Sequence, residues 1–169
     1  MEIGKRIDET IRLGLAPLLK QQGFSKSGRN FHRLSGKAWQ VVNVQASQGN
    51  SDASGKFTIN VGVYVPEVAV LAGQAPIAGK PKEDVHTVRE RMGELMPGGA
   101  DHWWALLPST DLAVVATSVT QAVTAYGLPW LEAHASVEQV AQALASQPSV
   151  MSAAAALAAL YAFTSSSSM

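Results

Sequence analysis

The sequence predicts an α+β fold, with one antiparallel sheet of about four strands and helices packed on one face of that sheet. The first observation is the alternation of apolar and polar residues from Phe57 to Val65, which is the two-residue period of a half-buried strand. The second is the helical spacing of apolar residues at the amino terminus and after residue 110. No linker divides two cores. We therefore expect a single domain over residues 1–163 and a disordered serine-rich tail at 164–169.

Two neighbouring strands are predicted at the centre of the chain, over residues 39–47 and 57–65. The segment between them is rich in Gly, Asn and Ser, and it is too long for a two-residue turn. A slip of one residue would set Gln45 against Ile59, so hydrophobic matching fixes the register. The chosen register builds one apolar face by placing Val44 opposite Ile59 and Val42 opposite Val61.

The other face of this strand pair is predicted to be rich in carboxamides and to turn outward. On that face the same interpretation places Gln45 opposite Asn60 and Asn43 opposite Gly62, with Val41 near Tyr64.

Further elements flank the central strands. An apolar stripe at the amino terminus predicts a helix, and Gly23 fits the left-handed position that ends it. We expect a second helix from an N-cap at Asp84 to Met96, because apolar residues recur at helical spacing and Pro97 follows. A short strand is expected over residues 103–107.

The carboxyl-terminal part is predicted to be helical. Asp111 precedes a helix that we expect to end at Gly127. The residues from Ser136 to Gln139 form a capping box for the next helix. The alanine-rich segment 151–163 predicts a last helix.

Composition excludes several classes of function. Lys plus Arg and Asp plus Glu both number 13, so no overall charge directs the chain to nucleic acid or to an anionic membrane. The absence of cysteine excludes disulfides and thiolate sites and suits a reducing compartment. The most apolar run, 153–163, is shorter than the ~20 residues that cross a bilayer. We expect a soluble cytoplasmic protein without nucleic-acid or membrane partners.

The sequence lacks the common motifs of catalysis and cofactor binding. Gly49 and Gly55 are separated by one residue too many for a phosphate-binding loop, and Phe57 stands where Ser or Thr is needed. The four histidines are far apart in sequence, which favours structural or surface roles over a metal site built by folding. No nucleophile elbow and no clustered acidic pair occurs. We therefore expect no cofactor and no metal, and we favour a protein that is not an enzyme.

Three polar clusters remain as candidate binding elements. Arg89 and Arg91 lie in the expected helix, where a solvated helix face is favoured over carboxylate or phosphate binding. If residues 101–104 are extended, Trp103 and Trp104 point to opposite faces, so that one anchors the core and the other is exposed to contact a partner. The favoured interpretation is that both pack under helices, with Asp101 capping a turn. The basic residues around Phe31 suit a protected hairpin edge better than a nucleic-acid site.

Several segments in order resemble a bacterial family, domain of unknown function 4304. The likeness runs through residues 18–26, 31–33, 42–47 and 57–63, and it continues in Arg89 with Arg91, in residues 101–104 and in residues 126–131. It covers roughly residues 3–144. The resemblance implies a bacterial protein and carries no catalytic residue with it.

We interpret the chain as a non-catalytic binding domain for a protein partner or a small polar ligand, because amides and aromatic rings suit reversible recognition. The alternative is a small-molecule-binding protein or enzyme whose site assembles around Arg33, Gln45, Arg89 and Asp101. The candidate binding residues are Arg33, Asn43, Gln45, Asn60, Tyr64, Arg89, Asp101, Trp103 and Trp104.

Overall fold

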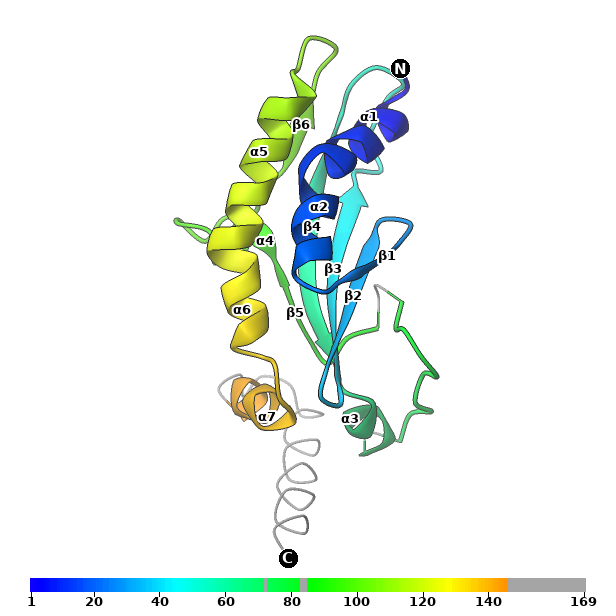
Figure 1. The fold of residues 1–169 in the computed structure, drawn as a ribbon, viewed down its shortest axis with the longest axis vertical. Helices are drawn as coiled ribbons and strands as arrows, with labels where there is room; N and C mark the ends of the chain where they lie inside the picture. Colours follow the sequence, from blue (N-terminus) through cyan, green and yellow to red (C-terminus); the bar gives the residue numbers. More distant parts are fainter. Residues whose placement is uncertain (72, 83–84, 146–169) are drawn as a thin grey trace, which may run out of the picture.

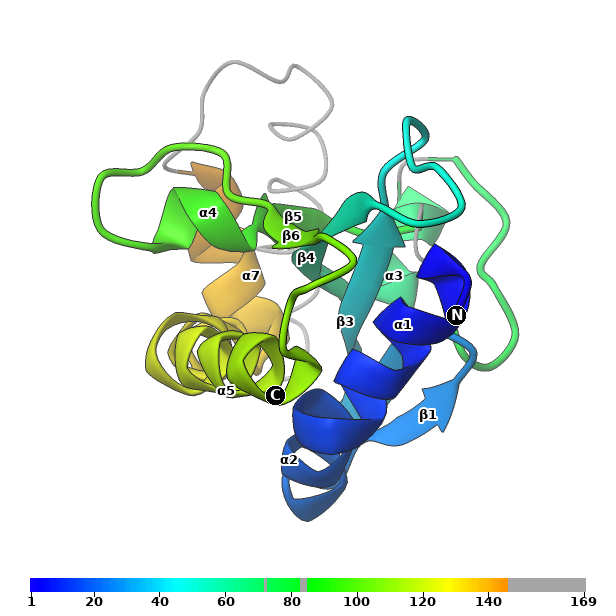
Figure 2. The same cartoon turned by 90° about the horizontal axis from the view of Figure 1, so that it is seen from above.

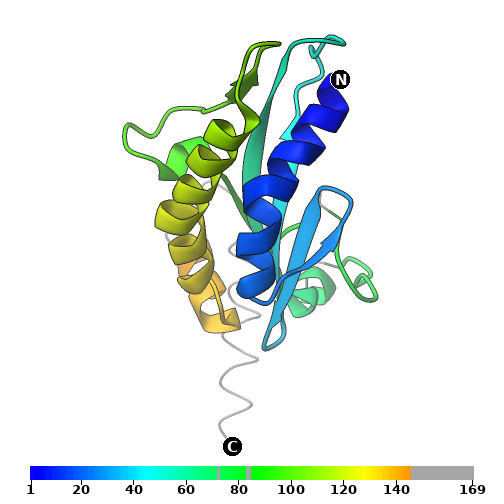
Figure 3. The ribbon, with the colours of Figure 1, turned by 45° about the horizontal axis from the view of Figure 1, so that its top comes forward.

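The computed structural model describes residues 1–71, 73–82 and 85–145, and over these ranges the chain adopts the expected α+β fold (Figure 1). One antiparallel sheet carries two helical rods side by side on one face (Figures 1 and 3). The helix expected over 151–163 and the tail expected at 164–169 lie outside the described residues.

The sheet has six strands in the described part of the chain, rather than about four. Their order is β1-β2-β3-β4-β5, and β6 also pairs with β4. The bounds are β1 Ser25–Ser27, β2 Asn30–Ser35, β3 Ala38–Ala46, β4 Gly55–Tyr64, β5 Val88–Arg91 and β6 Trp104–Leu106.

Both long rods contain a π-helical turn just before a proline. The first rod is α1 (Ile3–Thr10), η1 (Ile11–Leu15) and α2 (Ala16–Gln21), and the second is α5 (Leu112–Ala122), η2 (Val123–Gly127) and α6 (Leu128–Glu132). Pro17 and Pro129 lack an N–H, so the hydrogen-bond ladder changes its spacing there while the rod continues. The expected helix end at Gly127 is therefore wrong. The shorter helices are α3 (Pro66–Leu71), α4 (Met92–Leu95) and α7 (Val137–Ala145).

Helix ends follow the local signals in the sequence. Gly23 has a φ of 85°, and the N–H of Phe24 donates to the carbonyl of Leu19 at 2.9 Å, which closes the first rod as predicted. The Asp111 carboxylate accepts the N–H of Ala113 at the start of α5. The predicted capping box also forms, with reciprocal bonds of 3.1 Å between Ser136 and Gln139.

The apolar register of the central strands is confirmed. Val42 pairs with Val61 and Val44 pairs with Ile59. These residues are at most 3% exposed, and they form the core with the inner faces of the two rods. This burial of branched side chains against two helices is the main hydrophobic stabilisation of the fold.

The pairs expected on the opposite face of β3 and β4 are wrong. Antiparallel pairing keeps the sum of paired residue numbers constant, so the valine pairs already determine the others. The observed pairs are Gln45 with Thr58, Asn43 with Asn60, Val41 with Gly62 and Trp39 with Tyr64.

That second face, which we call the amide face, is buried rather than turned outward. Asn43 and Asn60 are each only 4% exposed. Segments outside the sheet cover parts of it: the Thr58 hydroxyl donates to the carbonyl of His102 at 2.8 Å, and the N–H of Ile77 donates to the hydroxyl oxygen of Tyr64 at 3.1 Å. The expectation of an exposed amide surface failed because both faces of the sheet are used for packing.

The helix expected from Asp84 is also wrong. Asp84 itself lies outside the described residues, and residues 88–91 form strand β5, which pairs with residues 60–63 of β4. The apolar spacing of Val88 and Met92 fits a helix locally, but pairing with β4 satisfies backbone groups that would otherwise form an open sheet edge. Only the short helix α4 remains of the prediction. The strand expected over 103–107 is confirmed as β6.

The second rod, Leu112–Glu132, is the one helix in the described ranges whose length and apolar composition would suffice to cross a membrane. Its residues Ala116, Val119 and Val123 are buried in the core. A core helix meets the same criterion, so this is weak evidence for a membrane span.

We expect the substitution Ile59→Ala to lower the free energy of unfolding by about 2–5 kcal/mol, because it removes buried methyl groups and leaves a cavity between sheet and helices. Chemical denaturation measures the change. The matched control is Val114→Ala, because that side chain on α5 is 65% exposed and its loss should cost at most about 0.5 kcal/mol. Equal effects of the two substitutions would contradict the assigned core.

Candidate functional site

One edge of β4 is paired with two short strands instead of one long strand, and the break between them brings residues from separate segments together. β5 pairs with residues 60–63 of β4, and β6 pairs with residues 55–57 along the same edge. Residues 92–103 leave the sheet between them, and α4 with its following loop projects away from it (Figure 2). A side chain at Gly93 would collide with the backbone of Ala100 and His102, so glycine lets the two ends of this excursion meet.

The half-buried indole of Trp103 lies at the point where the excursion returns to the sheet. Its Nε1 donates to an Asp101 carboxylate oxygen at 2.7 Å. Two cations lie over its ring: Lys56 Nζ is 5.1 Å from the ring centroid, and Arg91 Cζ is 5.5 Å from it. Arg91 also donates to both oxygens of Asp101, at 3.1 and 3.2 Å. The four side chains therefore form one connected cluster, which we call the Trp103 cluster.

The electrostatics of the cluster keep Asp101 charged. The hydrogen bond from Trp103, followed by that from Arg91, holds the pKa of the Asp101 carboxyl below its ordinary value. An ionised Asp101 fixes the orientation of the indole and of one guanidinium group. Trp103 is only half-buried and Lys56 is exposed, so the ring and the Lys56 ammonium are both accessible to solvent.

A row of carboxamides on the amide face leads to the Trp103 cluster. Asn43 Nδ2 donates to Asn30 at 2.8 Å, and Asn60 Nδ2 donates to both Asn43 Oδ1 at 3.1 Å and Gln45 Oε1 at 2.9 Å. Asn60 is the sheet neighbour of Arg91. Its Oδ1 is buried and has no hydrogen-bond partner. Burying an acceptor without a hydrogen bond costs free energy of folding, so Asn60 Oδ1 is an unsatisfied acceptor beside the Trp103 cluster.

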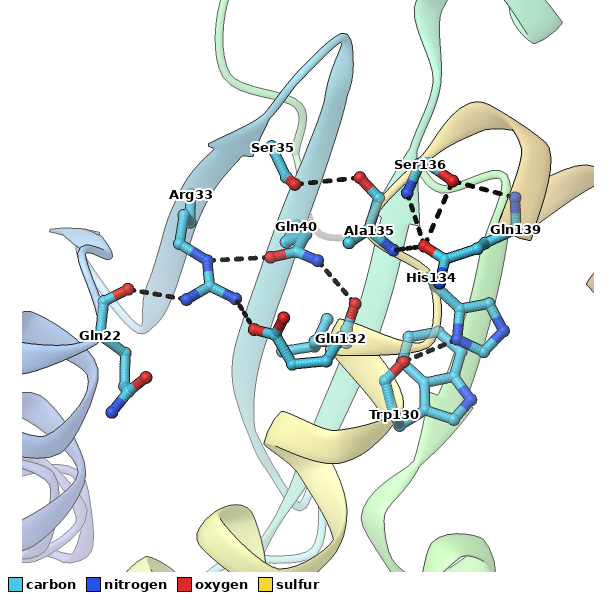
Figure 4. Close-up of polar contacts among 11 residues, drawn as sticks. Gln22, Arg33, Ser35, Gln40, Trp130, Glu132, His134, Ala135, Ser136 and Gln139 are labelled. Carbon is cyan, nitrogen blue, oxygen red and sulfur yellow. Dashed lines mark hydrogen bonds and ion pairs between the residues drawn. The ribbon is translucent and has the colours of Figure 1, made fainter.

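Arg33 lies on the other, helix-covered face of the sheet, where it joins the sheet to both rods (Figure 4). It donates to the carbonyl of Gln22 at 2.8 Å and to a Glu132 carboxylate oxygen at 3.0 Å. Its guanidinium carbon is 4.5 Å from the ring centroid of Phe24, and its Nε donates to Gln40 at 2.9 Å. All these partners belong to the protein itself, so the contacts of Arg33 describe a structural clamp.

Gln40 extends this clamp into the core. It is fully buried, and its Nε2 donates to the carbonyl of Leu131 at 2.7 Å (Figure 4). Nearby, the Ser35 hydroxyl donates to the carbonyl of Ala135 at 2.9 Å, next to the capping box of α7. These bonds tie β2 and β3 to the turn that follows α6.

The structure thus brings together part of the predicted set. Asn43, Gln45 and Asn60 form the carboxamide row, and Asp101 and Trp103 belong to the cluster beside it. Arg89 lies on the same face opposite Gly62, whereas Tyr64 is buried at the far end beside Trp39. Two predicted residues lie apart from this site: Arg33 is in the clamp, and Trp104 is in the core.

The tryptophan pair splits as the extended interpretation predicts. Trp104 is 5% exposed and stacks on Phe57 with ring centroids 5.8 Å apart, while Trp103 stays half-buried on the amide side. Lys56 and Arg91 were missing from the predicted set. Lys56 is four residues before Asn60 on the same strand, so alternation alone places both side chains on one face and could have predicted Lys56. Arg91 was assigned to a helix, so its neighbour on β4 could not be foreseen.

This site offers polar, charged and aromatic contacts. In the described ranges, no group of three or more His, Asp or Glu side chains gathers where a metal ion could bind. The cluster supplies two cations, an indole and one carboxylate already bonded to its neighbours, together with amide groups. Such a set can bind polar or anionic groups through hydrogen bonds, charge and ring contacts.

The fold and this site define a small α+β domain with a buried amide face and a cation–aromatic cluster at its edge. Residues 15–133, more than half of the chain, match the family described as Domain of unknown function (DUF4304). The chain belongs to this family. No curated protein and no solved structure matched the chain.

We expect Gln40→Ala to destabilise the fold, because it removes a fully buried side chain together with its hydrogen bonds to the Leu131 carbonyl and to Arg33 Nε. The expected loss is roughly 1–3 kcal/mol in the free energy of unfolding, measured in urea. Gln142→Ala on the exposed side of α7 is the control and should be nearly neutral. A neutral effect of Gln40→Ala would mean that the clamp does not hold the sheet to the second rod.

Glu90 on β5 should make stability depend on pH. Burial raises the pKa of its carboxyl from 4.5 to about 7, and the neighbouring Glu94 acts in the same direction. The folded state keeps the proton to higher pH than the unfolded state does, so the free energy of unfolding falls as pH rises from about 4.5 to about 7. Between about pH 5 and pH 8, wild type should lose melting temperature relative to Glu90→Gln, which cannot ionise. Glu138→Gln on exposed α7 is the control, and parallel melting profiles of wild type and Glu90→Gln would refute the assignment.

Proposed function

We propose that this domain is a non-catalytic binding module that recognises a protein partner or a polar ligand through the Trp103 cluster. The observation that carries the proposal is the half-exposed indole of Trp103, fixed by Asp101 and flanked by the cations Lys56 and Arg91. Aromatic and arginine side chains held in place before binding are typical anchors of recognition surfaces.

The surroundings of the cluster favour binding over catalysis. Asp101 is engaged by two donors and kept ionised, so it is poorly suited to donate or accept protons near neutral pH. Glu90 has a pKa suited to acid–base chemistry, but it follows the strand face of Val61, which is opposite to that of Asn60. The Glu90 carboxyl, whose pKa is raised, and the exposed indole of Trp103 therefore lie on different faces of the sheet.

The alternative enzyme site around Arg33, Gln45, Arg89 and Asp101 gains no support from the geometry. Arg33 is on the helix-covered face, and its donors are used within the clamp. Gln45 and Arg89 belong to the opposite face. One ligand could not contact all four side chains.

We place this activity in the bacterial cytoplasm. A chain without cysteine and with balanced charge suits a reducing compartment and gives no general attraction to nucleic acid or membrane lipid.

Replacing Trp103 by alanine should abolish recognition while leaving the fold intact, because the indole is outside the core. The expected loss is about 2 kcal/mol or more of binding free energy, which is typical of an aromatic anchor. The measurement is affinity capture from a lysate of the source organism, with wild type, Trp103→Ala and the exposed control Val114→Ala. Equal recovery of the same protein or ligand by Trp103→Ala and the other two would refute the proposal.

A further inference from the structure

The exposed part of the amide face carries an excess of positive charge. Among the residues that the structure describes on this part of the face, Lys56, Arg89 and Arg91 stand against the carboxylate of Asp101, a local net charge of +2 in a chain whose overall charge is zero. Arg91 is paired with Asp101. Within the ranges that the structure describes, neither Lys56 nor Arg89 has a carboxylate in ion-pair distance. Two exposed cations therefore remain for a ligand.

The spacing of these two cations indicates an extended ligand. Arg89 is the sheet neighbour of Gly62, and Lys56 is six positions earlier on the same strand β4. At ~3.3 Å per residue, the two positions are roughly 20 Å apart along the strand. A single small anion could not reach both, whereas a peptide of about six extended residues could.

Between the two cations lies an atom that requires a hydrogen-bond donor. Asn60 is buried, with 4% exposure. Its Nδ2 donates to both Asn43 and Gln45, and these two hydrogen bonds set the orientation of the amide. Oδ1 is left as an acceptor without a partner. Gln45, which accepts from Asn60 Nδ2, and Arg91, the sheet neighbour of Asn60, are both half-buried. Binding of a ligand N–H at Oδ1 requires side chains around this buried atom to move aside.

We propose that the partner recognised at the Trp103 cluster presents an extended acidic peptide segment. Its carboxylates pair with Lys56 and Arg89, one backbone N–H donates to Asn60 Oδ1, and an intervening side chain contacts the Trp103 ring. This inference rests on the proposed binding function and specifies the class of ligand.

Single-stranded nucleic acid also combines negative charge with groups that stack on aromatic rings, and two observations disfavour it. A base stacked on Trp103 would bring its own phosphate next to the ionised Asp101, whereas the proposed peptide places its carboxylates at Lys56 and Arg89 and an uncharged side chain at the ring. A peptide backbone offers an N–H at every residue, which the orphan acceptor of Asn60 requires, whereas a phosphodiester backbone offers no donor.

The test uses the full chain and three probes of equal length, monitored by tryptophan fluorescence and calorimetry. The probes are an eight-residue capped peptide with Glu at alternate positions, the same peptide with Gln in place of Glu, and an oligothymidylate. Wild type should bind the Glu peptide, bind the Gln peptide at least about fivefold more weakly, and lose affinity as salt is added. The double substitution Lys56→Gln with Arg89→Gln should weaken binding of the Glu peptide roughly five- to tenfold.

The matched control replaces two exposed cations elsewhere, Lys5→Gln with Lys20→Gln, and should bind like wild type. Both double substitutions are on the surface, so loss of folding does not obscure the result. Equal binding of the Glu and Gln peptides, equal affinity of the two double variants, or no binding of the Glu peptide would overturn the inference. Tighter binding of the oligothymidylate would overturn it in favour of nucleic acid. If Trp103→Ala abolishes capture in the lysate experiment while the Glu peptide fails here, the binding function stands and only the ligand class is wrong.

Discussion

The antiparallel ladder between β3 and β4 determines which side chains reach each face of the molecule. Once Val42 faces Val61, every other pair follows, so valines and isoleucine go to the helix side and carboxamides go to the other side. The two helical rods cover the first face (Figure 3). Because the second face is covered as well, its amides must bond to one another or to nearby backbone. The hydrogen-bonded row through Asn43 and Asn60 is a direct consequence of this one pairing.

The Trp103 cluster depends on a second pairing, along the opposite edge of β4. That edge is filled by two short strands, β5 and β6, with residues 92–103 looped out between them. The loop starts and ends at the same point of the sheet, so Arg91 meets Asp101 and Trp103. A rigid strand thus positions the cation, while the excursion positions the indole and the carboxylate.

Sequence patterns predicted the parts of the fold that depend on local or strongly periodic signals. These are the valine register, the helix end at Gly23 and the helix start at Asp111. They failed where a long-range contact outweighed a local pattern. Residues 88–91 look helical until the open edge of β4 is considered, and the helix passes Gly127 because packing continues beyond it.

The same distinction explains the outcome for the candidate site. Its carboxamide members share strand β4 or its neighbour β3, so alternation alone groups them. Arg33 also lies in a strand, but the face that it shares with Gln40 is set by the pairing of β2, which the sequence left open. Lys56 follows from the alternation of side chains along β4, which places it on the face of Asn60. The position of Arg91 follows only once β5 is known to be a strand. Sequence reasoning therefore grouped the carboxamides on one strand face, but it missed the burial of that face and the residues Lys56 and Arg91 beside it.

A buried polar group without a hydrogen bond can mark a functional position in a fold. Most polar groups on the amide face are satisfied, and the acceptor of Asn60 is an exception at the point where that face meets the exposed cluster. A valine at this position would avoid the unpaired acceptor, but it would also remove the donor to Asn43 and Gln45. A fixed acceptor beside two cations and an aromatic ring is costly in the free domain, and binding of a donor would recover that cost. If the proposed ligand binds here, the amide face would contribute to its recognition through the unsatisfied atom, and the remaining amides would hold that atom in position.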